Sequence, residues 1–550
     1  MNKPWLGQYP AGIEDRIDVD THPSLAAALE DSMGVYGRRT AFLHLGRRLT
    51  YAAVEKRSRA FAAWLQQEAG LGKGDRFAIM LPNCLEYVIA LVAAIRAGLV
   101  VVNINPLFTA RELEHQLTDS GAKAILVLEN FVATLEKVRD LVPVETVLVT
   151  RFADQLDLPK KALAGLAATR LNKHKWAPPG SMDFHAAVAH GASCRFTAPE
   201  LSHDDLLFLQ YTGGTMGRAK GAMLSHGNLI ANLLQCQAWF SHQLEPEPTE
   251  VVLTALPMYH IFALTVNILE FFTLGAKNVL VGNPRDMRMI VRLLRKHRIT
   301  ALTGVNTLFN GLLNTPGFEA LDFSSLKFAL GGGMATQQSV AESWQRVTGI
   351  PIIEGYGLSE TSPVVTCNRL ELTTFNHSIG LPLPATEVAI RDDQNHDLAV
   401  DHPGELCIRG PQVMSGYWNQ GSEAEFAFTT DGFFRSGDIA RMDANGLFYI
   451  VDRKDDMILV SGFNVFPNEI EDVVASHPGV VEGAAIGVAD EKSGQAVKLF
   501  VVPRDRALDR NAIRTWCADR LTKYKVPKHV EFTDEIPKSP VGKILRRQLR

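Results

Sequence analysis

The sequence predicts an α/β protein with a large N-terminal domain of layered α/β subdomains plus a β-rich subdomain, followed by a small α+β C-terminal domain. Three observations lead to this fold class. Short apolar runs alternate with helix-like segments before about residue 403, which is typical of helices layered on largely parallel sheets. Beyond that point the strand-like runs become shorter and more frequent. The charged run 452–456 lies between two apolar strands, as domain boundaries often do, so we predict domains over residues 1–453 and 454–550.

Two strand-to-helix units predict the parallel layers. Residues 77–81 form a short apolar run closed by a Pro-Asn pair, which predicts a buried strand, and a helical pattern follows from about Leu85. Residues 206–211 predict a second buried strand, followed by a Gly-rich loop and then by a helix from about residue 226.

Other local signals fill in the connections. Asn445-Gly446 predicts a tight turn between strands at 439–442 and 447–451. Apolar spacing around Ile470 predicts a helix in the C-terminal domain, and the acidic residues of its first turn suit the helix dipole. Residues from about 155 to 200 combine Pro, Gly, Ser and His with basic residues, and predict an irregular connection.

Composition narrows the class of protein. The 550 residues are 46% hydrophobic and 21% charged, the balance of a soluble globular enzyme, and the net charge of −4 argues against general binding to nucleic acid. The 6 cysteines are scattered without a C-x-x-C pair, so neither a structural zinc site nor a disulfide framework is expected. The reducing cytoplasm is the simplest location.

No segment predicts export or a membrane span. The first residues lack the apolar core of a secretory signal. The most apolar run, 87–104, contains Arg96, Gly98 and Asn103, and we interpret it as a buried helix that leads into a buried strand.

The Gly-rich loop after the strand at 206–211 predicts an anion site. Its sequence is Tyr211-Thr-Gly-Gly-Thr-Met-Gly-Arg-Ala-Lys220-Gly221. Glycines let backbone N–H groups approach an anion closely, hydroxyls add donors and Lys220 adds charge, which suits a triphosphate. The loop is not a P-loop, because Arg218 stands where the second glycine of that motif is required. Taken alone, it has a flexible surface loop as its less favoured alternative.

The loop resembles the phosphate-binding signature of the adenylate-forming superfamily, which contains acyl-CoA synthetases, luciferases and the adenylation domains of peptide synthetases. The resemblance covers essentially the whole chain, and at 303–309, 462–471 and 537–547 it is closest to the bacterial long-chain fatty acid–CoA ligases. Further motifs follow in the family's order: Leu256-Pro-Met-Tyr-His260, Gly331-Gly-Gly333, Gly355-Tyr-Gly-Leu-Ser-Glu-Thr361, Gly404 to Gly410, Ser436-Gly-Asp438, Asp452-Arg453, Ser461-Gly462 and Pro537-Lys-Ser-Pro-Val-Gly-Lys543.

The resemblance implies an ATP-dependent long-chain fatty acyl-CoA synthetase that uses ATP, Mg²⁺ and coenzyme A. It would join a fatty acid to AMP with release of pyrophosphate, and then pass the acyl group to the CoA thiol. Residues assigned to nucleotide binding by the resemblance are Thr212, Gly213, Gly214, Thr215, Gly217, Lys220, Gly331, Gly332, Gly333, Glu354, Gly355, Tyr356, Gly357, Asp438 and Arg453.

Particular roles within this set also follow from the resemblance. The loop from Thr212 to Lys220 would hold the β- and γ-phosphates, although Met216 replaces a usual hydroxyl and Arg218 a usual small residue. Tyr356 would stack on adenine, Asp438 would accept the ribose hydroxyls, and Arg453 would contact the ribose or a phosphate. Without the family resemblance, Asp438 would be interpreted as an ordinary turn residue, and Arg453 would be interpreted as part of a solvated run of charged residues.

Four residues are predicted to act in catalysis. Glu360, with Thr212, would bind Mg²⁺, a hard ion that favours oxygen ligands. Lys543 would neutralise charge between the carboxylate and the α-phosphate, and Thr361 would donate to that phosphate. His260 would lie at the mouth of the acyl pocket. Each of these residues also has a simpler interpretation. Lys543 could be a solvent-exposed lysine in a basic tail, Glu360 a carboxylate at a helix start, and His260 a core histidine.

In the family the small C-terminal domain is mobile and rotates between the two half-reactions. Asp455 occupies the hinge position, where relatives often carry Lys, and Gly462 would line the path of the pantetheine. Lys543 would leave the active site in the second state.

The sequence constrains the identity of the substrate acid, and the place from which the enzyme takes it, less closely. Residues 261–264 and 305–309 are apolar and fit either an alkyl tunnel or plain core. An ordinary surface connection is the simplest interpretation of the basic stretch 160–175. The alternative hypothesis is that this stretch rests on anionic lipid, which would give a cytoplasmic protein peripheral contact with the inner face of the membrane. The residues of this stretch that carry the charge are Lys160, Lys161, Arg170, Lys173 and Lys175.

Several alternatives stay open. The acid could be a medium-chain or aryl acid, or the acceptor could be something other than CoA. Met216 alone supports a catalytically silent relative, whereas Lys543, Glu360 and Asp438 argue against one. A phosphotransferase or NTPase would release ADP rather than AMP. Monomer and homodimer both fit the sequence.

Overall fold

The structure is a computed structural model. It describes the following residues: 3–156, 178–212, 219–240, 244, 249–420, 427–454, 456–461, 463–490, 493–504, 508–540 and 542–550.

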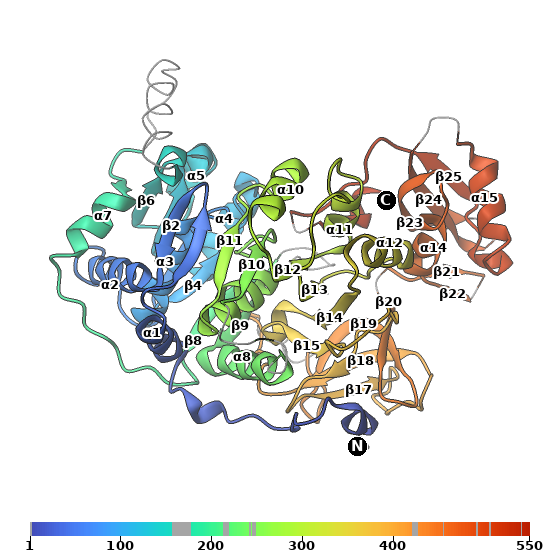
Figure 1. The fold of residues 1–550 in the computed structure, drawn as a ribbon, viewed down its shortest axis with the longest axis horizontal. Helices are drawn as coiled ribbons and strands as arrows, with labels where there is room; N and C mark the ends of the chain where they lie inside the picture. Colours follow the sequence, from blue (N-terminus) through green and yellow to red (C-terminus); the bar gives the residue numbers. More distant parts are fainter. Residues whose placement is uncertain are drawn as a thin grey trace, which may run out of the picture.

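The apolar run predicted at 77–81 is β3, the central strand of the first, largely parallel sheet, which also contains the strands labelled β4 and β6 in Figure 1. Phe77 and Ile79 point toward α1, α2, α3 and α7, whereas Ala78 and Met80 point toward α4 and α5, so both faces are covered. In strand order, the described members of this sheet are β7 (Met182–Asp183), β6 (Thr146–Thr150), β5 (Ala124–Leu128), β3 (Arg76–Met80), β4 (Val100–Asn103), β8 (Leu206–Thr212) and β9 (Lys220–Ser225). The helices are α1 (Leu25–Val35), α2 (Tyr51–Gln67), α3 (Leu85–Arg96), α4 (Ala110–Ser120), α5 (Val132–Glu136) and α7 (Phe184–Gly191).

A second sheet packs beside the first and carries the second set of helices. Its described strands, in order, are β16 (Leu381–Pro382), β15 (Val364–Cys367), β14 (Ile352–Gly357), β13 (Phe328–Gly331), β12 (Ala301–Gly304), β10 (Val251–Thr254), β11 (Lys277–Leu280), β1 (Thr40–His44) and β2 (Arg47–Thr50). The pairs from β14 through to β1 are parallel, as predicted for this half. One face packs on α8 (His226–Phe240), the π-helix η6 (Ala263–Glu270) and α9 (Phe271–Thr273); the other packs on α10 (Met287–Lys296), α11 (Asn306–Leu313) and α12 (Gln338–Thr348).

The β-rich subdomain is an antiparallel sheet of β17 (Glu387–Arg391), β18 (Gly404–Arg409), β19 (Phe434–Met442) and β20 (Phe448–Arg453). The predicted turn at Asn445-Gly446 is confirmed, with Gly446 at a φ of 82° and Asp443 accepting from the Leu447 N–H at 2.9 Å. The start of the chain packs here as well. Trp5, in the short helix η1 (Pro4–Gln8), is 1% exposed, and its ring meets Phe448 edge-on at 5.9 Å.

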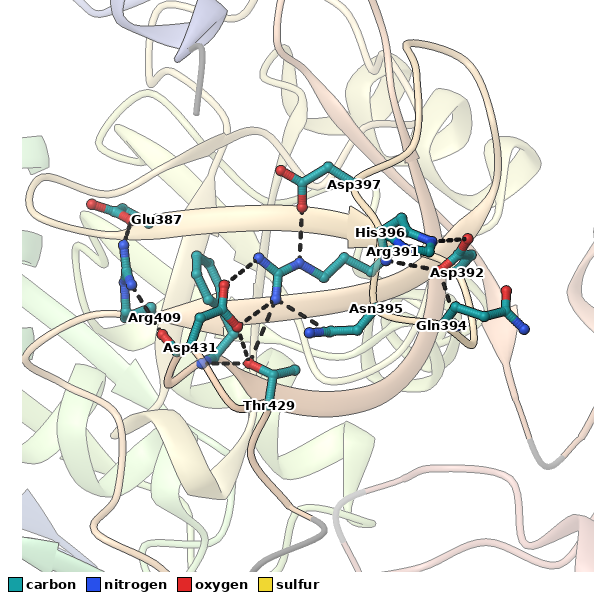
Figure 2. A network of polar contacts seen from close by, with 11 residues as sticks. Glu387, Arg391, Asp392, Gln394, Asn395, His396, Asp397, Arg409, Thr429 and Asp431 are labelled. Atoms are coloured by element: carbon teal, nitrogen blue, oxygen red, sulfur yellow. Dashed lines mark hydrogen bonds and ion pairs between the residues drawn. The ribbon is translucent and has the colours of Figure 1, made fainter.

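The buried side chain of Arg391 fixes the segment that leads into β19 (Figure 2). Both terminal nitrogens of Arg391 donate to Asp431, at 2.8 and 2.7 Å, its Nε donates to Asp397 at 2.9 Å, and the guanidinium lies over the ring of Phe433 at 4.4 Å. Bidentate pairs of this kind fix geometry as well as energy. The segment that leads into β19, the strand that carries Asp438, is therefore held against β17.

The C-terminal unit has its own sheet and core. β20 ends at Arg453, and from Ile458 onward the strands pair only with one another among the described residues. Its core forms between that sheet and two helices. The elements are β21 (Ile458–Val460), β22 (Phe463–Val465), α14 (Pro467–Ala475), β23 (Val480–Asp490), β24 (Gly494–Pro503), α15 (Arg510–Ala518) and β25 (His529–Phe532). These observations are compatible with the predicted boundary after residue 453.

One prediction about the fold is wrong in part. The connection expected to be irregular from about 155 to 200 contains β7 and the helix α7. Asp183 caps α7 by accepting from the Ala186 N–H at 2.9 Å, and Phe184 is buried against α2. Residues 157–177, including the basic stretch proposed to meet lipid, lie outside the described residues.

The apolar run 87–104 is a buried helix and strand, α3 and β4, as predicted. Arg96 is accommodated by ion pairs with Glu30 at 2.9 Å and Glu55 at 3.3 Å. In the part of the chain that the structure describes, no helix is both long enough and apolar enough to cross a membrane.

Candidate active site

Two glycine-rich strand ends form the floor of the site. β13 and β14 run parallel, so Gly331–Gly333 and Gly355–Gly357 emerge at the same edge of the sheet. Gly333 has a φ of 77°, and a Cβ built there would lie 3.6 Å from Cε of Lys543. A Cβ at Gly357 would lie only 2.0 Å from the Pro363 carbonyl oxygen. The positive φ therefore disfavours a side chain at Gly333, and the carbonyl contact leaves no room for one at Gly357.

Asp438 anchors a hydrogen-bonded group on the β-rich side. The Tyr356 hydroxyl donates to Oδ2 of Asp438 at 2.6 Å, and Arg453 pairs with Oδ1 at 3.0 Å. Asp438 and Arg453 are register partners in the β19–β20 ladder, which explains why the last residue of β20 reaches the site. Asp438 is 4% exposed, and burial raises the pKa of its carboxyl while Arg453 and Tyr356 oppose that rise.

Glu360 lies opposite, in the short helix η7 (Ser359–Thr361), which contacts both β8 and β9. It is 8% exposed, and Tyr417 donates to its Oε1 at 2.7 Å. Desolvation raises the pKa of Glu360, and the hydrogen bond from Tyr417 is the largest opposing effect. Lys220, at the start of β9, lies 5.5 Å from the centre of the Tyr417 ring. Tyr417 therefore joins the carboxylate to the base of the Gly-rich loop.

Lys543 enters this group from the C-terminal unit. It follows a turn in which the Lys543 N–H donates to the Ser539 hydroxyl at 3.1 Å, and Thr307 of α11 donates to the Gly542 carbonyl at 3.3 Å. Its side chain is accessible to solvent, yet enough protein surrounds it for desolvation to lower its pKa, with Arg453 lowering it further. Asp438 and Glu360 act in the opposite direction.

His260 lies near the same lysine. The Phe262 N–H bonds to its Nδ1 at 3.3 Å, and burial, reinforced by Lys543, lowers the pKa of His260 to about 3. The ring is therefore neutral at physiological pH and cannot itself neutralise an anion.

Two residues assigned to the substrate point elsewhere in this conformation. The Thr361 hydroxyl donates to the Pro363 carbonyl at 2.5 Å, so reaching the α-phosphate would require that bond to be exchanged. The Glu354 carboxylate accepts from the Thr336 N–H at 2.8 Å and holds the loop after β13; burial raises its pKa to about 7. Glu354 thus shapes the floor of the site.

Several predicted residues fall outside the described part of the chain: Gly213, Gly214, Thr215, Gly217, Asp455 and Gly462. Thr212 and Lys220, which flank the Gly-rich loop, are paired across β8 and β9. The apolar segments proposed for an alkyl tunnel are largely core. Ile261 and Leu264 belong to one buried cluster and Val305 and Phe309 to another.

Tyr417 is the site residue that sequence reasoning missed. It stands in Gly416-Tyr-Trp418, a segment that pairs with β9 through Met223 and Gly221. No local pattern marks it, because its partner Glu360 is 57 residues away in the chain.

Two models of known protein families match the chain. The model described as "AMP-binding enzyme" matches residues 29–418, and the one described as "AMP-binding enzyme C-terminal domain" matches residues 469–543. The chain belongs to the AMP-binding enzyme family. The glycine-rich strand ends and Glu360 lie within the range that the first of these models matches, whereas Asp438 lies between the two matched ranges.

Individual relatives cover 93–100% of the chain. A long-chain-fatty-acid–CoA ligase of Escherichia coli O157:H7 is 52% identical over 100% of this chain and 98% of its own. A feruloyl-CoA synthase of an Amycolatopsis species is 33% identical over 93% of this chain and 95% of its own. The crystal structure of ATP-bound MatB from Rhodopseudomonas palustris matches with a TM-score of 0.83 at 28% identity, over 96% of this chain and 98% of that one.

The donor set fits the magnesium complex of ATP. Lys543, Arg453 and Lys220 contribute three cations, and the two carboxylates, Glu360 and Asp438, are buried with raised pKa values. A carboxylate oxygen suits Mg²⁺, and the cations suit phosphate oxygens.

Proposed function

We propose that this ATP-dependent acyl-CoA synthetase activates long-chain fatty acids. A carboxylate oxygen of the acid attacks the α-phosphorus of ATP, the bond to the bridging oxygen of pyrophosphate breaks, and acyl-AMP forms. The CoA thiolate then attacks the acyl carbon, and AMP leaves. ATP, Mg²⁺ and CoA are the cosubstrates and metal of this reaction. The full-length similarity to long-chain-fatty-acid–CoA ligases supports the class of acid.

The observation that carries the proposal is the placement of Lys543 over Gly333 at the floor of the site, where the charges of Asp438 and Glu360 raise its pKa against the effect of burial. A lysine supplied by the C-terminal unit shares one electrostatic environment with two buried carboxylates of the N-terminal domain. The attacking acid and the α-phosphate are both anionic, so a cation between them lowers the barrier to attack. Arg453 and Asp438 would fix the ribose, and Glu360 with Thr212 would hold Mg²⁺.

The remaining roles are proposals of the same kind. We place the boundary between domains after residue 453, the hinge at Asp455 and the CoA path at Gly462, on the strength of the family resemblance. Tyr356 would stack on adenine through its ring while its hydroxyl stays on Asp438. Gly213, Gly214, Thr215 and Gly217 would donate backbone N–H groups to the β- and γ-phosphates.

The test is acid-dependent release of pyrophosphate from ATP, with and without CoA, across saturated acids of increasing length. Maximal release with long chains, together with formation of the thioester, supports the proposal. A preference for an aromatic acid would instead favour an activity like that named for the feruloyl relative. Release of ADP, or no release with any acid, would refute adenylation.

A Lys543→Ala variant sharpens the assay. We expect acyl-AMP formation to fall by about 10²–10³-fold, the typical effect of removing one preorganised charge-stabilising group. Conversion of supplied acyl-AMP to acyl-CoA should be nearly unchanged, because Lys543 is proposed to leave the site in that step. Equal losses in both half-reactions would contradict this role.

A further inference from the structure

A group of potential metal ligands lies outside the candidate active site, where α7 ends against α2. Glu68, His190 and Cys194 each place a ligand atom within 4.8 Å of the other two. In the part of the chain that the structure describes, no other three His, Cys, Asp or Glu side chains lie so close together. The sequence-based prediction against a structural zinc site considered pairs of cysteines, and a site with a single cysteine falls outside it.

The contact between the two helices holds Glu68 and His190 in place. Gly191 is the last residue of α7, and a Cβ built there would lie 2.0 Å from the Ala60 carbonyl oxygen of α2, so the two backbones touch. His190 is the residue before this contact, and Glu68 is the C-cap of α2. Figure 1 shows α7 alongside α2. Both side chains therefore extend from rigid backbone.

The turn that follows α7 brings Cys194 to the same place. The Cys194 N–H donates to the Gly191 carbonyl at 3.1 Å, and the thiol contacts the His190 carbonyl at 3.7 Å. The chain beyond is tied back to α2, because the Gln66 side chain donates to the Thr197 carbonyl at 2.8 Å and accepts from the Thr197 N–H at 3.1 Å. The other five cysteines are all buried, so Cys194 is the one that an ion in solution can reach most easily.

The spacing and the chemistry of the group suit zinc. Nε2 of His190 and Oε1 of Glu68 are 3.3 Å apart, and the two side chains are 57% and 44% exposed. Bonds of about 2.0–2.3 Å place the ligand atoms of a tetrahedral zinc about 3.3–3.8 Å from one another, so a small movement of the thiol completes the geometry. Thiolate and imidazole favour zinc over magnesium or calcium. One thiolate and one carboxylate also balance the charge of a divalent ion.

We propose that Glu68, His190 and Cys194 bind one zinc ion, with water as the fourth ligand. Binding releases the thiol proton to solvent and leaves the imidazole neutral. The ion fixes the end of α7 to the end of α2, and it stabilises the native state because the unfolded chain does not hold the ligands together. The alternative is an ordinary ion pair beside an unrelated thiol. The exposed pair of Asp392 and His396, at 3.3 Å, is an example of such a pair without a cysteine.

The experiment measures zinc binding by equilibrium dialysis, with the untagged full-length enzyme stripped of metal and kept free of ATP. The test variants are Cys194→Ser and His190→Ala, and the matched control is His396→Ala. Loss of a residue that only supports a metal ligand costs about 10–100-fold in affinity, so loss of a ligand itself should cost at least about 100-fold, and the control should change less than about twofold. Cobalt in place of zinc should give a thiolate-to-metal charge-transfer band in the wild type and in the control, and the band should be lost in Cys194→Ser.

The outcomes separate the alternatives. One zinc per chain, the cobalt band, and weakened binding in both test variants together support the proposal. Equal affinity in the wild type and the test variants overturns it, and so does binding that is lost in Cys194→Ser but kept in His190→Ala, which would indicate a thiol acting alone. Absence of the cobalt band in the wild type also overturns it, whether or not the variants fold. Neither measurement uses a substrate, so both are independent of the proposed acyl-CoA activity.

Discussion

Tyr417→Phe tests whether the hydroxyl on Glu360 positions the magnesium ligand. The change removes the O–H that donates to Glu360 at 2.7 Å and keeps the ring that lies beside Lys220. Burial, together with the Glu360 charge, raises the pKa of Tyr417, so the hydroxyl is a donor at every working pH. A hydrogen bond to a charged group is worth about 1.5–3 kcal/mol net. Tyr417 is partly exposed, so water can replace part of the bond, and we take about 1.5 kcal/mol, or roughly tenfold.

The assay is pyrophosphate release at varied MgATP. We expect KM for MgATP to rise about tenfold, kcat to change less than about threefold, and KM for the acid and for CoA to stay unchanged. Tyr449→Phe is the matched control, since it removes a hydroxyl bonded to Asp443 at 3.3 Å in the β-rich subdomain. A change below about twofold in KM for MgATP, or an equal rise in KM for the acid, would refute the reasoning.

Two further predictions concern a buried carboxylate and a crowded glycine. Glu270 is fully buried, and among the described residues only Gln237 lies close enough to oppose the rise in its pKa, without reaching good hydrogen-bond geometry. Burial raises its pKa well above the usual 4.5, so its contribution to stability is complete below about pH 4.5 and is lost as pH rises toward the folded-state pKa. Glu270→Gln should therefore raise Tm relative to the wild type by an amount that grows from about pH 5 to pH 8, and a constant difference would contradict this. Gly357→Ala places a methyl group 2.0 Å from a backbone carbonyl oxygen. It should lower the free energy of unfolding by about 1–3 kcal/mol and abolish most of the activity. In the control Gly34→Ala the added methyl group meets nothing within 4 Å, so stability and activity should both be unchanged.

Most of the fold is accessible from the sequence because the strands buried on both faces are continuous apolar runs. β3, α3, β8 and α8 all occur where those runs and the helical spacing predict them. α7 was missed because its short Ala- and His-rich sequence has a weak helical pattern, and its stability comes from the Asp183 cap and from packing on α2.

The site could be predicted only where a motif is local. Lys543, Glu360 and Asp438 lie in recognisable motifs, and the structure brings them into one electrostatic group. The role of Tyr417 depends on a contact between distant segments, and the inward orientation of Glu354 depends on the loop that follows β13. Both are consequences of tertiary packing that no single segment encodes.

The packing of Trp5 links the first residues of the chain to β20, a strand that is synthesised much later. Its ring packs against Phe448, and the backbone at Trp5 closes over Gly446 so tightly that a Cβ there would lie 2.5 Å away. During synthesis Trp5 has no Phe448 to pack against until that hairpin has left the ribosome, which takes about 20–90 s at 5–20 residues per second. Tyr9 can meet Trp239 of α8 within that interval, so we expect the N-terminal arm to dock in two stages, with the ring of Trp5 seated last.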